Sequence, residues 1–122
     1  MTTPYDPGNV FARILRGEIP CRRVYENEHV LAFDDIAPQA PVHTLVIPKG
    51  AYVSLEDFTA KATPAEQAAL MAAIGEVARI KGVAASGYRV LSNCGADGRQ
   101  EVPHLHFHVV GGTQLGRMLP RE

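Results

Sequence analysis

The chain has 122 residues, of which 46% are hydrophobic and 20% are charged, and its formal net charge is -1. This length suits one domain, and the composition is that of an ordinary globular protein. The balanced charge argues against nucleic acid or a membrane surface as a partner, because both need a clustered basic surface. The two cysteines form no disulfide framework, and no apolar run reaches the roughly 20 residues of a membrane helix, so we expect a cytoplasmic protein.

The N-terminal residues 1–8 contain two prolines and a glycine, and we expect a flexible leader there, followed by a single domain over residues 9–122. A short helix is predicted directly after the leader, because Asn9 is a favourable N-cap and the apolar residues of VFARIL recur with a helical period. Gly17 is expected to end this helix.

Three strands are expected next in the chain. Two of them lie within CRRVYENEHVLAFDD, on either side of a turn at residues 26–28. After the proline-containing loop IAPQAP, the β-branched residues of VHTLVIPKG predict the third strand, which stops at Pro48 and Gly50.

The clearest helical pattern in the chain is TPAEQAALMAAIGEVARIKG. Thr63 suits the N-cap, Pro64 suits the first helical position, and Glu66 has the spacing of a capping box. Apolar residues at helical spacing predict a buried stripe, and Gly82 is expected to close the helix.

Two further strands are predicted from GYRVLSNCG and HLHFHVVGG, with the glycine-rich loop GADGRQ between them. Antiparallel hairpins with helices set to one side predict an α+β domain. A parallel crossover through the long helix is the alternative arrangement.

The last predicted strand carries three of the five histidines of the chain on alternate positions. Successive side chains of a strand point to opposite faces. The two faces are therefore expected to hold His104, His106 and His108 on one side and Leu105, Phe107 and Val109 on the other. Each buried imidazole needs hydrogen-bond partners, so three on one face indicate a functional site.

Two kinds of chemistry fit the histidine face. Two of its imidazoles can bind zinc, with His43 from another predicted strand as a third ligand. Alternatively, one histidine attacks an electrophile as a neutral imidazole while its neighbours orient it.

The loop before the histidines favours the nucleophilic interpretation. In NCGADGRQ, Gly95 and Gly98 allow backbone N–H groups to approach an anion closely. Arg99 adds positive charge, and Asn93 can donate from its amide. A phosphate centre is therefore the expected electrophile.

These residues resemble the histidine triad (HIT) family, whose motif alternates histidine with apolar residues and reads HLHFHVV here. The following Gly111-Gly112 resembles the Hint branch of nucleotide-binding phosphoramidases, and FARILRGEIP, LAFDDIAPQAPVHTLVIPK and LSNCGADGRQEV agree with the family. The resemblance spans about residues 9 to 112. It implies an α+β HIT-like fold, an antiparallel sheet of about five strands, one long and one short helix, and a homodimer paired through the long helix and the sheet edge.

The resemblance also implies a hydrolase that acts at the α-phosphate of a purine nucleotide, with no cofactor and no metal ion. His106 would attack phosphorus and carry the nucleotidyl group, and His108 would contact the phosphate. His104 and His43 would fix the tautomer and charge of His106. Asp35 would hold the ribose hydroxyls as a bidentate acceptor.

Further nucleotide contacts follow from positions that match the family. Those around the purine are Phe11, Ile14, Ile19, Phe33, Asp34 and Ile36. Those of the phosphate-binding loop are Asn93, Gly98, Arg99, Gln100 and Glu101. By residue type alone, the apolar members would suit any core, and Asp35 would suit a turn.

The chain departs from the family pattern at a few positions. Some bacterial relatives bind structural zinc through two cysteines, which correspond here to Asn9 and Ala12, so no such zinc site is expected. Glu101 stands where animal Hint proteins carry a serine, and its carboxyl either protonates a leaving amine or faces solvent. Pro103 is more similar to the dinucleotide-polyphosphate hydrolase branch.

The favoured hypothesis is hydrolysis of a nucleoside 5'-phosphoramidate or acyl-adenylate through a covalent nucleotidyl-His106 intermediate. One alternative is a dinucleoside polyphosphate hydrolase, which uses the same chemistry on another leaving group. A second is a nucleotide-binding sensor with vestigial activity. A zinc-binding module is the weakest of the four.

Overall fold

The computed structural model describes residues 4–120, and residues 1–3 and 121–122 lie outside the described part. The elements in chain order are α1 (Val10–Leu15), β1 (Arg22–Glu26), β2 (Val30–Asp34), β3 (Val42–Pro48), α2 (Leu55–Lys61), α3 (Pro64–Ile80), β4 (Tyr88–Leu91) and β5 (Phe107–Gly111). The strands form one sheet in the order β1-β2-β3-β5-β4, and every pair is antiparallel. The α+β prediction is confirmed, and the parallel crossover is wrong.

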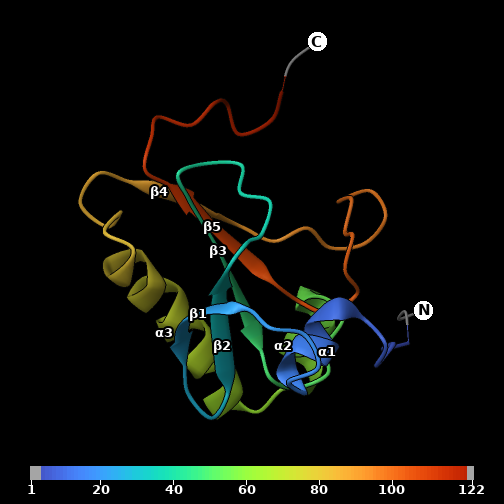
Figure 1. Cartoon of the computed structure of the whole chain (residues 1–122). Helices are drawn as coiled ribbons and strands as arrows, with labels where there is room; N and C mark the ends of the chain where they lie inside the picture. The colour runs from blue at the N-terminus through green and yellow to red at the C-terminus, as the bar shows by residue number, and fades with distance from the viewer. Residues whose placement is uncertain (1–3, 121–122) are drawn as a thin grey trace.

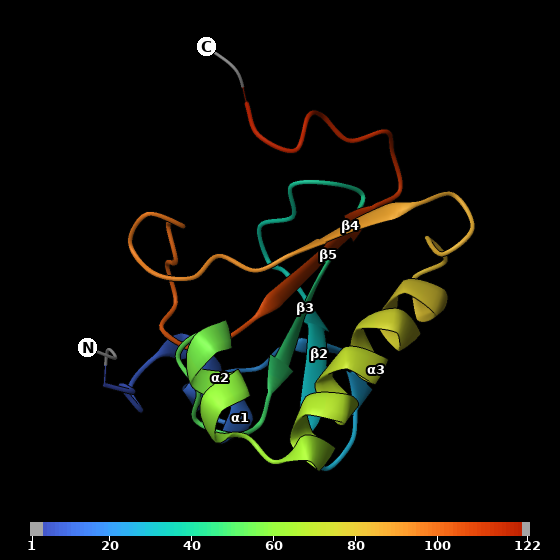
Figure 2. The same cartoon turned by 180° about the vertical axis from the view of Figure 1, so that it is seen from behind.

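The sheet separates two apolar layers. Helices α2 and α3 cover one face, and the short α1 lies on the other (Figures 1 and 2). Strand residues alternate between the two layers. Val30, Ala32, Val46 and Val109 pack toward α2 and α3, whereas Leu31, Phe33, Leu45 and Ile47 pack with Phe11 of α1. The face beside α1 is the one that carries the histidines.

The helix signals in the sequence correspond to observed caps. The Asn9 side chain accepts a hydrogen bond from Ala12 N at 2.9 Å, and Gly17 follows α1 with a φ of 79°. At the start of α3, Glu66 N donates to the Thr63 hydroxyl and Thr63 N donates to the Glu66 carboxylate, so the predicted capping box is confirmed. Within residues 4–120, no helix has both the length and the apolarity needed to cross a bilayer.

The structure contains a second short helix, α2, that the sequence analysis did not predict. Only Asp57 and Phe58 of this helix are buried, so its apolar stripe is too short to show a period. A start signal is nevertheless present, because Ser54 precedes a first turn that contains Glu56 and Asp57.

Strand β5 is shorter than predicted, since it begins at Phe107 rather than at His104. The ladder with β3 ends at the pair Val46–Phe107. Two residues further along β3, Pro48 has no N–H to donate, so the ladder does not continue past it. The Leu105 N–H instead donates to the carbonyl of Tyr52 at 2.8 Å. His104 and His106 are therefore held outside the sheet ladder, although their side chains still alternate with Leu105.

The segment before α1 is packed where the structure describes it, although a flexible leader was predicted there. The Tyr5 hydroxyl donates to Nδ1 of His104 at 2.7 Å, and the carbonyl of Asp6 accepts from the Asn9 amide at 2.7 Å. The carbonyl of Pro7 accepts from Arg16 at 2.7 Å. Residues 1–3 of the predicted leader lie outside the described part, and residues 5–7 make these hydrogen bonds with the domain.

Candidate active site

The four predicted catalytic histidines lie together on the α1 face of the sheet. His108 comes from β5 and His43 from the neighbouring β3, while His104 and His106 precede β5. His43 shares a face with Leu45 and Ile47 because β-strand side chains alternate. The ring centroids of His106 and His108 are 5.1 Å apart, as are those of His43 and His108.

His104 is fully buried and its ring is used for structure. Its Nε2 lies 2.8 Å from the carbonyl of Pro48, which can only accept, so Nε2 carries the hydrogen. Its Nδ1 then accepts from the Tyr5 hydroxyl. Burial lowers the pKa of His104 to about 4, so the ring is neutral at physiological pH. This ring makes no hydrogen bond to His106.

His106 has a defined tautomer. Its Nδ1 lies 2.7 Å from the backbone carbonyl of His104, so Nδ1 carries the hydrogen and Nε2 bears a free lone pair. The edge of the ring meets Phe11 with centroids 4.9 Å apart. Burial lowers the pKa of His106, which keeps the imidazole unprotonated. A neutral imidazole with a free Nε2 is a nucleophile.

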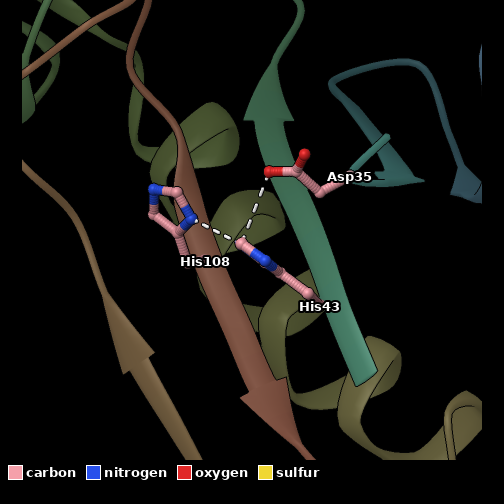
Figure 3. Close-up of side chains that lie close together, drawn as sticks. All are labelled: Asp35, His43 and His108. Atoms are coloured by element: carbon pink, nitrogen blue, oxygen red, sulfur yellow. Dashed lines mark hydrogen bonds and ion pairs between the residues drawn. The ribbon is translucent and has the colours of Figure 1, made fainter. Parts of the chain in front are cut away.

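His43 and His108 form a relay that fixes a second tautomer. The backbone N–H of Gln39 donates to Nδ1 of His43 at 3.1 Å, so Nδ1 is the acceptor and the ring carries a hydrogen on Nε2. That Nε2–H donates to Nδ1 of His108 at 2.9 Å (Figure 3). His108 in turn carries its hydrogen on Nε2. Burial lowers the pKa of His108 to about 4, so its ring is neutral at physiological pH.

The Nε2–H of His108 has no acceptor among the residues that the structure describes, although it is buried. A buried donor without a partner costs roughly 1–3 kcal/mol, and such groups are rare in native structures. Because His108 lines the same cavity as His106, its free N–H can bind an oxygen of a ligand beside the nucleophilic nitrogen.

Asp35 lies directly after β2, next to this relay. One carboxylate oxygen accepts from Ala37 N at 2.9 Å, and the other lies 3.5 Å from Nε2 of His43 (Figure 3). Ligand atoms of Asp35, His43 and His108 lie within 4.8 Å of one another, so these three residues could hold a metal ion. A metal there would replace the hydrogen bond between the two imidazoles.

A cavity of about 340 Å³ opens beside His106, on the α1 side. The residues predicted around the purine all line it; they are Phe11, Ile14, Ile19, Phe33, Asp34 and Ile36. Phe11 and Phe33 are also core residues, whereas Ile36 is 97% exposed and stands at the rim. Asp34 is tied to Lys81 at 2.9 Å and to the Thr44 hydroxyl at 2.9 Å.

The predicted phosphate-binding loop borders a second cavity of about 440 Å³, which is lined by Gln39, Asn93, Gly98, Arg99, Glu101, His106 and His108. Gly98 is required by packing, because a Cβ there would lie 2.5 Å from the carbonyl oxygen of Cys94. Gln100 does not line the cavity. Its side chain donates to the carbonyls of Val53 and Val102 and accepts from Gly95 N, so it anchors the loop.

The connections among the histidines differ from those that the resemblance implied. Neither the ring of His104 nor that of His43 fixes His106. The carbonyl of His104 does so, while His43 orients His108. Two contributors were missed, Tyr5 and the backbone of Gln39. Tyr5 gave no sequence signal, and Gln39 contributes a main-chain N–H that its side chain does not reveal.

Comparisons with known proteins agree with the resemblance. A model of the HIT domain matches residues 16–115. An uncharacterised 13.2 kDa HIT-like protein of Azospirillum brasilense is 65% identical over 121 residues, which is 99% of each chain. The purine nucleoside phosphoramidase of Escherichia coli K12 is 40% identical over 115 residues, covering 93% of this chain and 94% of that protein. A HIT family hydrolase structure from Clostridium thermocellum aligns with a TM-score of 0.84 at 38% identity, covering 92% of this chain and 97% of that one.

Proposed function

The chain belongs to the histidine triad family and has its α+β fold, and from this we propose that it hydrolyses purine nucleoside 5'-phosphoramidates or acyl-adenylates at the α-phosphate. The observation that carries the proposal is the pair of fixed tautomers. His106 presents a free Nε2 lone pair, and His108 presents an unpartnered Nε2–H, in one cavity. A nucleophile beside a hydrogen-bond donor suits attack on a phosphoryl group.

In the first step, Nε2 of His106 attacks phosphorus, and the P–N bond to the leaving amine breaks. The leaving nitrogen takes up one proton, from solvent or from Glu101, which borders both cavities. The ring of His106 becomes positively charged as the N–P bond forms. Its Nδ1–H bond to the His104 carbonyl then stabilises that charge.

In the second step, water attacks the nucleotidyl-His106 intermediate. A P–O bond forms, the bond from phosphorus to Nε2 breaks, and the attacking water loses one proton. The nucleoside monophosphate leaves and His106 is again neutral. The Nε2–H of His108 donates to a phosphoryl oxygen in both steps, and Asp35 at the rim of the nucleoside cavity accepts from the ribose hydroxyls.

We expect His106→Ala to abolish turnover of adenosine 5'-phosphoramidate while nucleoside monophosphate binding is largely kept. The nitrogen that forms the covalent bond is lost, but the walls of the cavity remain. Steady-state kinetics and titration calorimetry measure the two effects. Rapid quenching and peptide mass mapping test for the intermediate itself. The peptide that contains His106 is expected to gain the mass of a nucleoside monophosphate less one water. Turnover by His106→Ala at the wild-type rate would refute the mechanism.

A homodimer formed through the sheet edge is part of the proposal. Strand β4 lies at one edge of the sheet, and its Tyr88 and Val90 are 43% and 38% exposed. Met71 and Ile80 of α3 are also exposed apolar residues. An edge strand with apolar side chains favours pairing with another strand, and a second copy of β4 can supply one.

A further inference from the structure

Arg99 combines two features that draw attention to its side chain. Its φ of 61° makes it the one non-glycine residue with a positive φ between residues 4 and 120. This left-handed conformation costs an L-residue energy, and such residues gather at functional sites. In the same described range, its guanidinium makes no hydrogen bond and no ion pair, although Asp97 and Glu101 are each two residues away in the sequence.

The loop around Arg99 is held rigidly enough to keep this conformation. The Arg99 N–H donates to the carbonyl of Ala96 at 3.0 Å, and Gln100 N donates to the carbonyl of Gly95 at 3.1 Å. The Gln100 side chain ties the loop to Val53. Because these bonds fix the backbone, the Cα–Cβ direction of Arg99 is fixed as well.

The location of Arg99 points to the leaving-group side of the reaction centre. The second cavity, which Arg99 lines, shares only Glu101, His106 and His108 with the nucleoside cavity. The phosphorus lies at the shared residues, because His106 forms the covalent bond. With the nucleoside on the α1 side, the departing group occupies the second cavity, and the exposed guanidinium of Arg99 stands at its edge.

We propose that Arg99 selects substrates whose leaving group carries negative charge, by binding that charge beyond the scissile bond. This inference rests on the proposed function. A carboxylate on a leaving amine and a phosphate of a leaving polyphosphate present the same anionic oxygens, and a guanidinium binds either in a bidentate manner.

The test compares two adenosine 5'-phosphoramidates that differ only in the charge of the leaving group, one of glycine and one of glycinamide. The wild type and the variants Arg99→Gln and Arg99→Lys are assayed for kcat/KM at low and high salt. Both variants keep a side chain at the strained position, so backbone freedom stays similar. Arg99→Gln removes the positive charge, whereas Arg99→Lys keeps it. Arg23→Ala, which removes a β1 cation away from both cavities, serves as the control.

Relative to Arg99→Gln, the wild type is expected to favour the glycine amidate over the glycinamide amidate by about fivefold, the magnitude of an exposed charge pair. Arg99→Lys keeps most of this preference, Arg23→Ala keeps all of it, and high salt reduces it. If the protein also hydrolyses diadenosine tetraphosphate, that turnover is expected to fall in Arg99→Gln, because the leaving polyphosphate is anionic. An equal loss on both amidates would place Arg99 on the α-phosphate and overturn the inference.

Binding separates this inference from the proposed function. The two intact amidates are titrated calorimetrically into His106→Ala with either arginine or glutamine at position 99. Tighter binding of the glycine amidate that depends on Arg99 upholds charge selection even if no turnover is found. If the glycine amidate and the glycinamide amidate bind equally tightly whichever residue stands at position 99, charge selection is rejected even if turnover is fast.

Discussion

His106 obtains its reactive tautomer from a main-chain carbonyl two residues earlier in the chain. The hydrogen bond from Nδ1 to the His104 carbonyl is local in sequence and uses the backbone of residue 104 rather than its ring. The ring of His104 is free for another task, which is to join Pro48 at the end of β3 to Tyr5 before α1. One residue thus fixes the His106 tautomer through its backbone and joins two segments of the fold through its side chain.

The neutral state of His104 makes the stability of the fold sensitive to acid. Its pKa is about 4 in the fold and about 6.5 when unfolded, so between these values the unfolded chain binds more protons. The contribution of neutral His104 to the free energy of unfolding is complete above pH 6.5 and is lost as the pH falls to 4. At roughly 1.4 kcal/mol per pH unit, the loss is about 3 kcal/mol.

Urea unfolding at several pH values measures this loss of stability. NMR titration of the His104 Cε1–H shows whether His104 is the group responsible for it. The signal is expected to keep its neutral shift down to about pH 4. A midpoint near 6.5 for His104 would contradict the assignment. His106 and His108 have lowered pKa values for the same reason of burial, so they steepen the acid loss of stability.

Helix α3 is the element that the sequence specifies most completely. Its N-terminus has a reciprocal capping box, and its buried stripe of Leu70, Ile74 and Val77 packs on β2 and β3. Strand β5 is specified less completely, because its first residue depends on where β3 stops donating hydrogen bonds. The start of an isolated strand pattern cannot reveal a proline that lies opposite it.

Thr63→Ala is expected to lower the free energy of unfolding by about 1 kcal/mol, because Glu66 N loses its side-chain acceptor. Chemical denaturation measures the change. Thr59→Ala is the matched control, since Thr59 is an exposed residue inside α2 whose hydroxyl bonds only helix carbonyls. Equal effects of the two substitutions would show that the cap contributes nothing specific.

At the scale of the whole molecule, the sheet has two different faces and two different edges. The α2 and α3 face forms one apolar core, while the α1 face combines a second apolar cluster with the histidines. This arrangement places the histidine cluster beside the paired strands β3 and β5 and leaves β4 at the edge.

Sedimentation equilibrium is expected to give twice the chain mass of 13.2 kDa if β4 pairs with a second copy. Val90→Asp places a charge on this edge and is expected to yield monomers. Arg23→Glu changes charge on the opposite edge strand, β1, and is expected to leave the dimer intact. A wild-type monomer at micromolar concentration would contradict the proposed assembly.

The sequence by itself determined the presence of every helix and strand except α2, the antiparallel α+β class, and the separation of the histidines from Leu105 and Val109. Helix caps, turns and strand alternation are local properties, which is why the sequence reveals them. The HIT family was equally readable from the residues between about 9 and 112. Tertiary structure alone decided the hydrogen-bond partners of the His104, His43 and His108 rings. The contacts of Tyr5 with His104, of Gln39 with His43, and of His43 with His108 join backbone and side-chain atoms that no local pattern relates. The tautomers of His104, His43 and His108 depend on such contacts, and so does the unpartnered N–H of His108.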